Sequence, residues 1–293
     1  MILYKYYSPQ CHNFQAVLDG NFWFSTNKIL NDPYDLNCGK ALWNMPITKT
    51  IQFKNRILEG LKILLQEKKN TDKVQDCYES IKSTILQFAS CSFSRNCIDR
   101  LMWAHYADSY SGFCIGYEID KDSINNFHSV LYTDQITESL LKVPKNNTKN
   151  DEIINEREAY GAEGNTISLK SYLSVCLDSY LNRKTQKNEE YVERMLCIKA
   201  QEWSYEQEVR LIKKVAEGQH GQLVNGAEFG QILPKKIIVG YRFNWKQQSG
   251  NCNTTSKYVI KNFQDQGVPI FQLKLDNQRF FALTPYPINV NNI

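Results

Sequence analysis

Short runs of apolar, aromatic and β-branched residues occur near both ends of the chain, bounded by turn-forming residues, and this pattern predicts β-strands. Between them, apolar residues recur every three or four positions, which predicts amphipathic helices. The predicted strands are 2–7, 22–24, 89–94, 113–118, 130–132, 206–213, 236–241, 269–275 and 280–283. The predicted helices are 14–18, 57–65, 74–88, 100–107, 169–181 and 191–197.

Strands at both ends with helices between them predict one α+β domain over residues 1–293, built on a mostly antiparallel sheet with flanking helices. Residues 145–164 are polar and rich in Asn, Lys and Glu, with little periodicity. We therefore expect residues 135–197 to form a helical and loop insertion within the domain.

Composition places the chain among ordinary globular proteins, with 42% hydrophobic and 23% charged residues. A net charge of +4 is too small to require a nucleic-acid partner. The apolar segments are short and interrupted by charges, so we expect no membrane-spanning helix and no membrane partner. Nine scattered cysteines without a C-x-x-C pair, and a first segment without signal-peptide architecture, predict reduced thiols and a cytoplasmic location.

The motifs of several large enzyme classes are missing from the sequence. It has no phosphate-binding G-x-x-x-x-G-K-[ST] loop, no G-x-G-x-x-G, no H-E-x-x-H and no G-x-S-x-G. Common nucleotide-binding, metalloprotease and serine-hydrolase machinery is therefore not expected.

The sharpest local pattern is the segment 203–211, read as a strand. Alternation then puts Glu206, Glu208 and Arg210 on one face, while Val209 and Leu211 face the core. Paired carboxylates can stabilise a developing cation, activate a hydroxyl or hold a metal. The alternative is a solvated face of an edge strand with an ion pair of little energetic value.

Three further segments carry candidate residues, each with a purely structural alternative. The turn-rich segment 31–35 offers Asn31, Asp32 and Asp35 to the rim of a site, or forms only a turn and a helix cap. Segment 101–106 offers Trp103 and His105 to a pocket, or places its aromatics in the core. The aromatic strands with Tyr6 and Trp23 could stack on a flat ligand, or be core.

The order of these motifs is more specific than any one of them. The chain resembles the bacterial domain-of-unknown-function family 2971, which occurs among accessory genes and in some phage-defence settings. The segments that carry the resemblance are 3–6, 22–25, 31–35, 91–94, 102–106, 112–117, Lys199 and 203–210.

The layout is also similar to the ADP-ribosyltransferase superfamily, which clamps NAD with a split antiparallel sheet. By this resemblance, Lys5 or Tyr6 takes the first-strand position, and Trp23 with Ser25 takes the aromatic-serine strand end. Glu208, within Glu206-Gln207-Glu208, takes the position of the catalytic glutamate.

The resemblance implies a chemistry in which NAD is the substrate and no metal takes part. Glu208 would bond the ribose 2′-hydroxyl and stabilise the oxocarbenium-like state, and Glu206 would orient or deprotonate the acceptor. Trp23 or Tyr6 would stack on nicotinamide, while Lys5 or Arg210 would meet the pyrophosphate.

The leading hypothesis is therefore an intracellular bacterial effector, of toxin or phage-defence type, that transfers ADP-ribose from NAD or hydrolyses NAD. Its acceptor would be a protein or a nucleic acid, and an antitoxin or sensor could restrain it.

Two alternatives stay open. One is a metal-dependent nuclease that gathers acidic side chains around Mg²⁺ with a lysine near the phosphate; its residues would be Asp32, Asp35, Glu118, Glu206 or Glu208, and Lys5 or Lys199. The other is a non-enzymatic module that senses a ligand or binds a partner.

Overall fold

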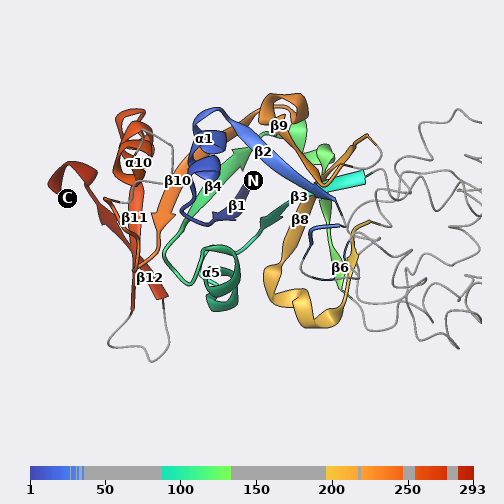
Figure 1. Cartoon of the computed structure of the whole chain (residues 1–293), viewed down its shortest axis with the longest axis horizontal. Helices are drawn as coiled ribbons and strands as arrows, with labels where there is room; N and C mark the ends of the chain where they lie inside the picture. The colour runs from blue at the N-terminus through green and yellow to red at the C-terminus, as the bar shows by residue number, and fades with distance from the viewer. Residues whose placement is uncertain are drawn as a thin grey trace, which may run out of the picture.

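The computed structural model describes residues 1–26, 28–30, 32, 35, 88–132, 196–216, 219–246, 255–275 and 283–293. These residues form a mixed α+β fold built on one large sheet, as the sequence predicts (Figure 1). Outside the described residues lie the predicted helices 57–65 and 169–181, residues 74–87 of the predicted helix 74–88, and residues 135–195 of the predicted insertion 135–197. Phe88, expected to end the helix 74–88, instead begins a strand.

The large sheet follows the order β12-β11-β10-β4-β1-β3-β2-β9, and β8 continues it from β3 to β5. Its pairings are antiparallel except for the parallel pair β10–β11. A small parallel pair stands apart, formed by β6 (Leu131–Tyr132) and β7 (Ile198–Lys199). The strands of the large sheet are β1 (Ile2–Tyr7), β2 (Asn21–Thr26), β3 (Phe88–Ser94), β4 (Phe113–Ile119), β5 (Phe127–Ser129), β8 (Glu208–Lys214), β9 (Gly221–Asn225), β10 (Ile232–Val239), β11 (Ile270–Leu275) and β12 (Leu283–Ile288).

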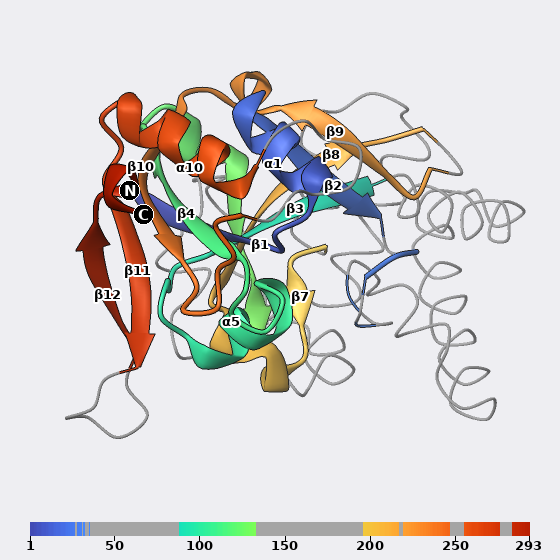
Figure 2. The ribbon, with the colours of Figure 1, turned by 60° about the vertical axis from the view of Figure 1, so that its left-hand side comes forward.

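Helices cover both faces of the sheet (Figure 2). Helices α1 (Cys11–Leu18) and α10 (Ser256–Asp265) pack on one face, and α5 (Arg100–Tyr106) packs on the other. Four short 3₁₀ segments connect the described elements: η2 (Ser123–Asn126), η3 (Gln201–Glu206), η4 (Gly226–Phe229) and η5 (Val290–Asn292).

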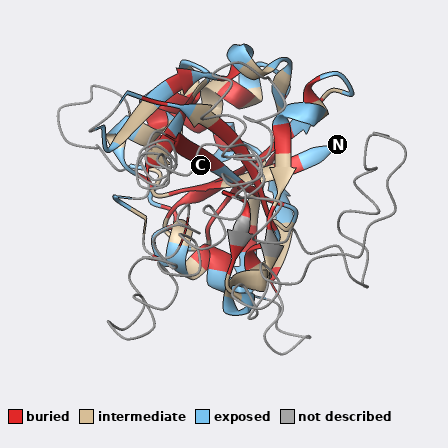
Figure 3. Ribbon diagram, turned by 90° about the vertical axis from the view of Figure 1, so that its right-hand side faces the viewer, coloured by how far each residue is buried: buried red, intermediate tan, exposed pale blue. Residues whose placement is uncertain are grey.

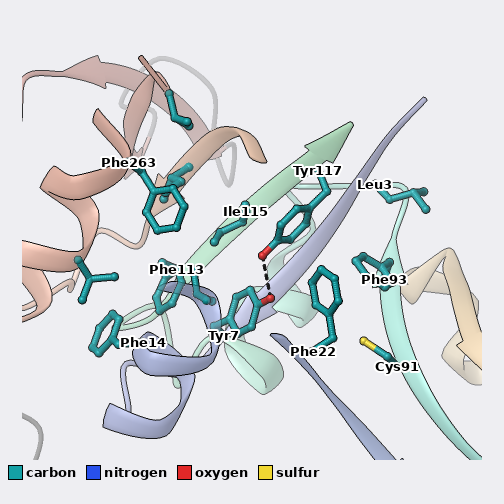
Figure 4. Close-up of a cluster of buried hydrophobic side chains, with 14 of the residues drawn as sticks. Leu3, Tyr7, Phe14, Phe22, Cys91, Phe93, Phe113, Ile115, Tyr117 and Phe263 are labelled. Carbon is teal, nitrogen blue, oxygen red and sulfur yellow. Dashed lines mark hydrogen bonds between the residues drawn. The ribbon is translucent and has the colours of Figure 1, made fainter. Parts of the chain in front are cut away.

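The main core lies under α1 and α10 and is rich in aromatic rings (Figure 4). Phe113 stacks between Phe14 and Tyr7, with ring centroids 5.1 Å apart in both contacts. The hydroxyls of Tyr7 and Tyr117 pair at 3.0 Å in this apolar surrounding, and burial raises the pKa of both phenols. Buried positions concentrate in the central strands (Figure 3), as expected for a sheet covered on both faces.

The sheet splits beside β3. One edge of β3 pairs with β8 along its whole length, so β1 and β2 must share the other edge. There β2 pairs with Ala89 and Ser90, whereas β1 pairs with Ser94. Between these two contacts, no other described strand pairs with that edge of β3. The Lys5 amine donates to the Ser92 carbonyl in this gap at 3.0 Å.

Several local expectations need correction. The strand predicted to begin at Glu206 begins at Glu208, because η3 occupies the residues before it. Strand β9 and helix α10 were not predicted from the sequence. Cys11 is disulfide-bonded, so the expectation that all cysteines are reduced is wrong there, although Cys91, Cys97, Cys114 and Cys197 are free. Among the described helices, none has the length and apolar character needed to span a membrane.

Candidate functional site

The sheet face opposite the main core carries polar side chains from adjacent strands. In register, Ser92 lies opposite Arg210 and Ser94 lies opposite Glu208, so these four side chains project to the same side. Their neighbours Cys91, Phe93, Val209 and Leu211 project to the other side and belong to the main core. Strand alternation therefore assembles a polar face from β3 and β8.

A left-handed residue brings two carboxylates together at the start of β8. Gln207 has φ of 45°, and this turn separates Glu206 at the end of η3 from Glu208 at the start of the strand. The Ser94 hydroxyl donates to the Glu206 carbonyl at 2.7 Å and ties the turn to β3. A left-handed conformation is costly for a non-glycine residue, and at Gln207 it sets the relative placement of the two carboxylates.

Arg210 lies at the centre of a buried charged cluster, which we define as Asp35, Lys199, Glu206, Glu208 and Arg210. The guanidinium is fully buried and donates to both oxygens of Glu208, from Nε at 2.7 Å and from Nη2 at 2.8 Å. Nη2 also reaches Asp35 Oδ1 at 2.6 Å, and Nη1 donates to the Leu196 carbonyl at 2.6 Å. This bidentate geometry gives the cluster a fixed arrangement.

Lys199 joins the three carboxylates of the charged cluster. Its amine lies 2.6 Å from Glu206 Oε2, 3.1 Å from Asp35 Oδ2 and 3.3 Å from Glu208 Oε2. The same amine lies 4.9 Å from the ring centroid of Trp203, which covers it from one side. One ammonium thus occupies the point where the carboxylates converge.

The two glutamates have opposite electrostatic environments. Burial raises the pKa of Glu206 to about 7; Lys199 opposes that rise, and the nearby Glu208 carboxylate adds to it. Burial alone would also raise the pKa of Glu208, but Arg210 and Lys199 outweigh it and hold that pKa well below the usual range. Two cations neutralise two of the three carboxylates, and the third therefore retains a proton more readily.

The charged cluster is buried but adjoins accessible side chains. Ser92 is exposed although it lies mid-strand beside Arg210, and a hydrogen bond from its side chain helps to lower the pKa of Glu208. On another side, the Tyr106 hydroxyl donates to Glu206 Oε1 at 2.5 Å from a half-buried position on α5. The side chains that link the cluster to the surface are therefore Ser92 and Tyr106.

The charged cluster contains four of the predicted site residues from two distant parts of the sequence: Asp35 from one, and Glu206, Glu208 and Arg210 from the other. The alternative of a solvated strand face is wrong, because Glu206, Glu208 and Arg210 are at most 4% exposed. Asp32 is also buried and its carbonyl accepts a hydrogen bond from the Asp35 amide. Asn31 lies outside the described residues.

The first-strand candidates lie on opposite faces of β1. Lys5 projects toward the core face, over the rings of Tyr7 and Phe93, and reaches the gap beside Ser92. Tyr6 projects to the polar face, where it is buried edge-on against Trp103 and donates to the Asn96 carbonyl at 2.8 Å. The contact of Lys5 with the polar strand β3 is thus the hydrogen bond to the Ser92 carbonyl at the split.

The remaining candidates are divided between surface and core. Ser25 lies opposite Ser90 on the polar face, and Trp23, two residues earlier, is 44% exposed on that face. Trp103 is fully buried and donates to the Cys97 carbonyl at 2.9 Å. Its side chain therefore belongs to the core, as the structural alternative for segment 101–106 states. His105 is exposed, with ring contacts to Tyr106 and Tyr205.

The fold brings together only some of the acidic residues that the nuclease alternative requires. Glu118 pairs with Lys235 on the surface at 2.9 Å, on β4. Asp35, Glu206 and Glu208 meet on the Lys199 ammonium, and no group of three or more His, Cys, Asp or Glu side chains in the described ranges is arranged to hold a metal.

Sequence reasoning missed Ser92, Tyr106 and Tyr132 as members of the site. The Tyr132 hydroxyl accepts a hydrogen bond from the Glu208 amide at 2.7 Å. Serines at 90, 92 and 94 alternate with Cys91 and Phe93, and this period of two could have identified the polar face. Tyr106 and Tyr132 carry no comparable signal, because their contacts depend on tertiary packing.

The fold and charged cluster define an α+β protein with a polar, carboxylate-bearing sheet face. Residues 102–211 match the family described as "Protein of unknown function (DUF2971)", which confirms the family resemblance expected from the sequence. The matched range includes Tyr106, Lys199, Glu206, Glu208 and Arg210. No curated protein and no solved structure matched the chain.

Proposed function

We propose that this protein is an enzyme that cleaves the bond between nicotinamide and ribose in NAD, and transfers ADP-ribose to an acceptor or to water. The observation that carries the proposal is the pair of adjacent glutamates with opposite pKa shifts. Divergent pKa values in neighbouring carboxyls suit a division between electrostatic and acid–base roles.

Glu208 is suited to the electrostatic role. Its carboxylate stays ionised beside Arg210 and Lys199, and a fixed negative charge near the ribose is worth more in an oxocarbenium-like transition state than in the ground state. The exposed Ser92 hydroxyl beside it offers a polar contact for the ribose.

Glu206 is suited to the acid–base role, because a pKa of about 7 keeps both protonation states populated near neutral pH. The split beside β3, with Lys5 reaching into it, supports binding of an anionic pyrophosphate there. Under this proposal the acceptor is a protein, a nucleic acid or water, and the chain acts in the cytoplasm as a toxin or phage-defence effector.

A second candidate is a non-enzymatic module that senses a ligand or binds a partner. It is favoured by the internal pairing of the charged cluster, in which Arg210 and Lys199 bond all three carboxylates. Internally paired ionic clusters also occur as structural features of protein cores.

The test is release of nicotinamide from NAD by the full chain in EDTA. We expect release by the wild type and a loss of at least about 100-fold in both Glu208→Gln and Glu206→Gln. Glu228→Gln is the matched control, because that carboxylate pairs with Lys213 on the surface, and it should retain wild-type release.

Calorimetric titration with NAD accompanies the assay. It measures NAD binding even where a missing acceptor or trigger prevents release of nicotinamide. If the wild type neither binds NAD nor releases nicotinamide, the proposal is contradicted. NAD binding without release by any variant would favour the sensing module, and cleavage of nucleic acid only with Mg²⁺ would favour the nuclease.

A further inference from the structure

Glu206 is too deeply buried to meet an acceptor directly, since its residue is 3% exposed. Its oxygens are committed to two partners: Oε2 to the Lys199 amine at 2.6 Å and Oε1 to the Tyr106 hydroxyl at 2.5 Å. Lys199 is buried as well, whereas Tyr106 is half-buried. The route from solvent to Glu206 that these contacts define runs through the Tyr106 hydroxyl.

The fold holds Tyr106 firmly in this position. Asp99 caps α5 by accepting from the amides of Leu101 and Met102, and buried Trp103 anchors the helix through the Cys97 carbonyl. Beyond the helix, Asp108, Ser109 and Tyr110 all have positive φ, between 47° and 70°. Three consecutive left-handed non-glycine residues are rare and costly, which is typical of segments that fix a functional geometry.

We propose that Tyr106 is the proton relay between the acceptor hydroxyl and Glu206. This inference rests on the proposed function and adds to it the residue that contacts the acceptor. Because a phenol both donates and accepts hydrogen bonds, one oxygen can pass a proton inward while receiving another.

The reaction balances without an oxidant or a metal. The C1′–N bond of NAD breaks, and its electron pair leaves with neutral nicotinamide. The oxygen of an acceptor hydroxyl, or of water, bonds to C1′ and loses its proton to the Tyr106 oxygen. Tyr106 gives its own proton to Oε1 of the ionised Glu206 carboxylate, so the net change is one proton moved from the acceptor to the carboxyl, and the tyrosine is regenerated.

The titratable groups that face Glu206 are Lys199 from β7, Glu208 from β8, Tyr106 from α5, Tyr132 from β6 and Tyr205 from η3. Of these, Tyr106 and Lys199 lower the pKa through direct hydrogen bonds. Tyr106→Phe removes one of these hydrogen bonds and leaves the charges in place, so the Glu206 carboxyl should titrate at higher pH in this variant.

The experiment compares Tyr106→Phe with wild type in two measurements on the full chain. With water as acceptor, we expect kcat for nicotinamide release to fall about 100-fold or more, while the Kd for NAD changes less than about threefold. By infrared titration of ¹³C-glutamate-labelled protein, with Glu206→Gln to assign the band, we expect a higher Glu206 pKa in Tyr106→Phe. In the pH profile of kcat for nicotinamide release, the acidic limb should move in the same direction.

Tyr110→Phe is the control for disturbance of α5. Its hydroxyl donates to the Arg100 carbonyl at the helix start, without contact to Glu206, so this variant should keep kcat within about threefold. The relay would be overturned if Tyr106→Phe kept the wild-type kcat and the wild-type acidic limb of the pH profile while Glu206→Gln was inactive. If the wild type releases no nicotinamide, the proposed function fails, and an unchanged Glu206 pKa in Tyr106→Phe separately overturns the coupling of the two residues.

Discussion

Replacement of Arg210 tests whether the charged cluster is held together as the distances indicate. Arg210→Met removes four hydrogen bonds, two to Glu208, one to Asp35 and one to the Leu196 carbonyl. Methionine keeps much of the side-chain volume, so the change acts mainly on charge. Among the described residues, Lys199 is then the one ammonium that faces the three buried carboxylates.

The expected loss is about 3–5 kcal/mol of unfolding free energy, the usual cost of removing one partner from a buried ion pair. For a chain of this size, about 2–4 °C of Tm accompanies each kcal/mol, so the midpoint should fall by roughly 6–20 °C. The assay is urea unfolding of the full chain. The free energy of unfolding in water is extrapolated with the same dependence on urea concentration for both proteins.

Two comparisons make this prediction refutable. Lys213→Met lies on the same strand but breaks a surface pair with Glu228, whose side chain is 52% exposed, and should cost about 0–1 kcal/mol. The double variant Glu208→Met/Arg210→Met leaves Asp35 paired with Lys199 and should cost less than the sum of the two single changes. A loss for Arg210→Met as small as that of Lys213→Met would mean that the guanidinium does not hold the charged cluster together.

Two further predictions concern the start of β8. Glu206 has a pKa raised to about 7 by burial, so its stabilising contribution is complete below its unfolded value of about 4.3 and is lost as pH rises toward 7. Glu206→Gln should therefore gain stability relative to wild type between pH 5 and 8, by about 2–3 kcal/mol in urea titrations, and a relative loss would contradict this. Gln207→Gly should stabilise the chain by about 0.5–1 kcal/mol, because glycine adopts the φ of 45° without strain; a lower urea midpoint than wild type would argue against strain at this residue.

The sequence predicted the alternating strands well because hydrophobic alternation is a local property. The strand 2–7 and the helix from Arg100 match the structure closely, and Glu208 and Arg210 share a face as expected. The prediction at Glu206 was wrong in local structure but right in proximity, because the left-handed Gln207 restores the convergence that a continuous strand would have given.

The composition of the charged cluster could not be predicted from local pattern. Asp35 and Arg210 are 175 positions apart, and their ion pair depends on the tertiary fold. The burial of the charged side chains on β8 was also not predicted, because a row of charges on a strand normally indicates a solvated face. In the structure, β8 is covered on both sides and paired at both edges. Lys199 supplies the second cation that makes this burial tolerable.

Glu206 and Glu208 should differ in protonation state near neutral pH, because burial raises the pKa of one and two cations lower that of the other. The most direct measurement is infrared titration of ¹³C-glutamate-labelled full chain, with Glu206→Gln to assign the bands. We expect one carboxyl to lose its proton near pH 7 and this transition to disappear in Glu206→Gln, while Glu208 stays ionised down to the acid limit of the folded protein. Titration of Glu206 near the ordinary value of about 4.3, or protonation of Glu208 above that value, would contradict the account.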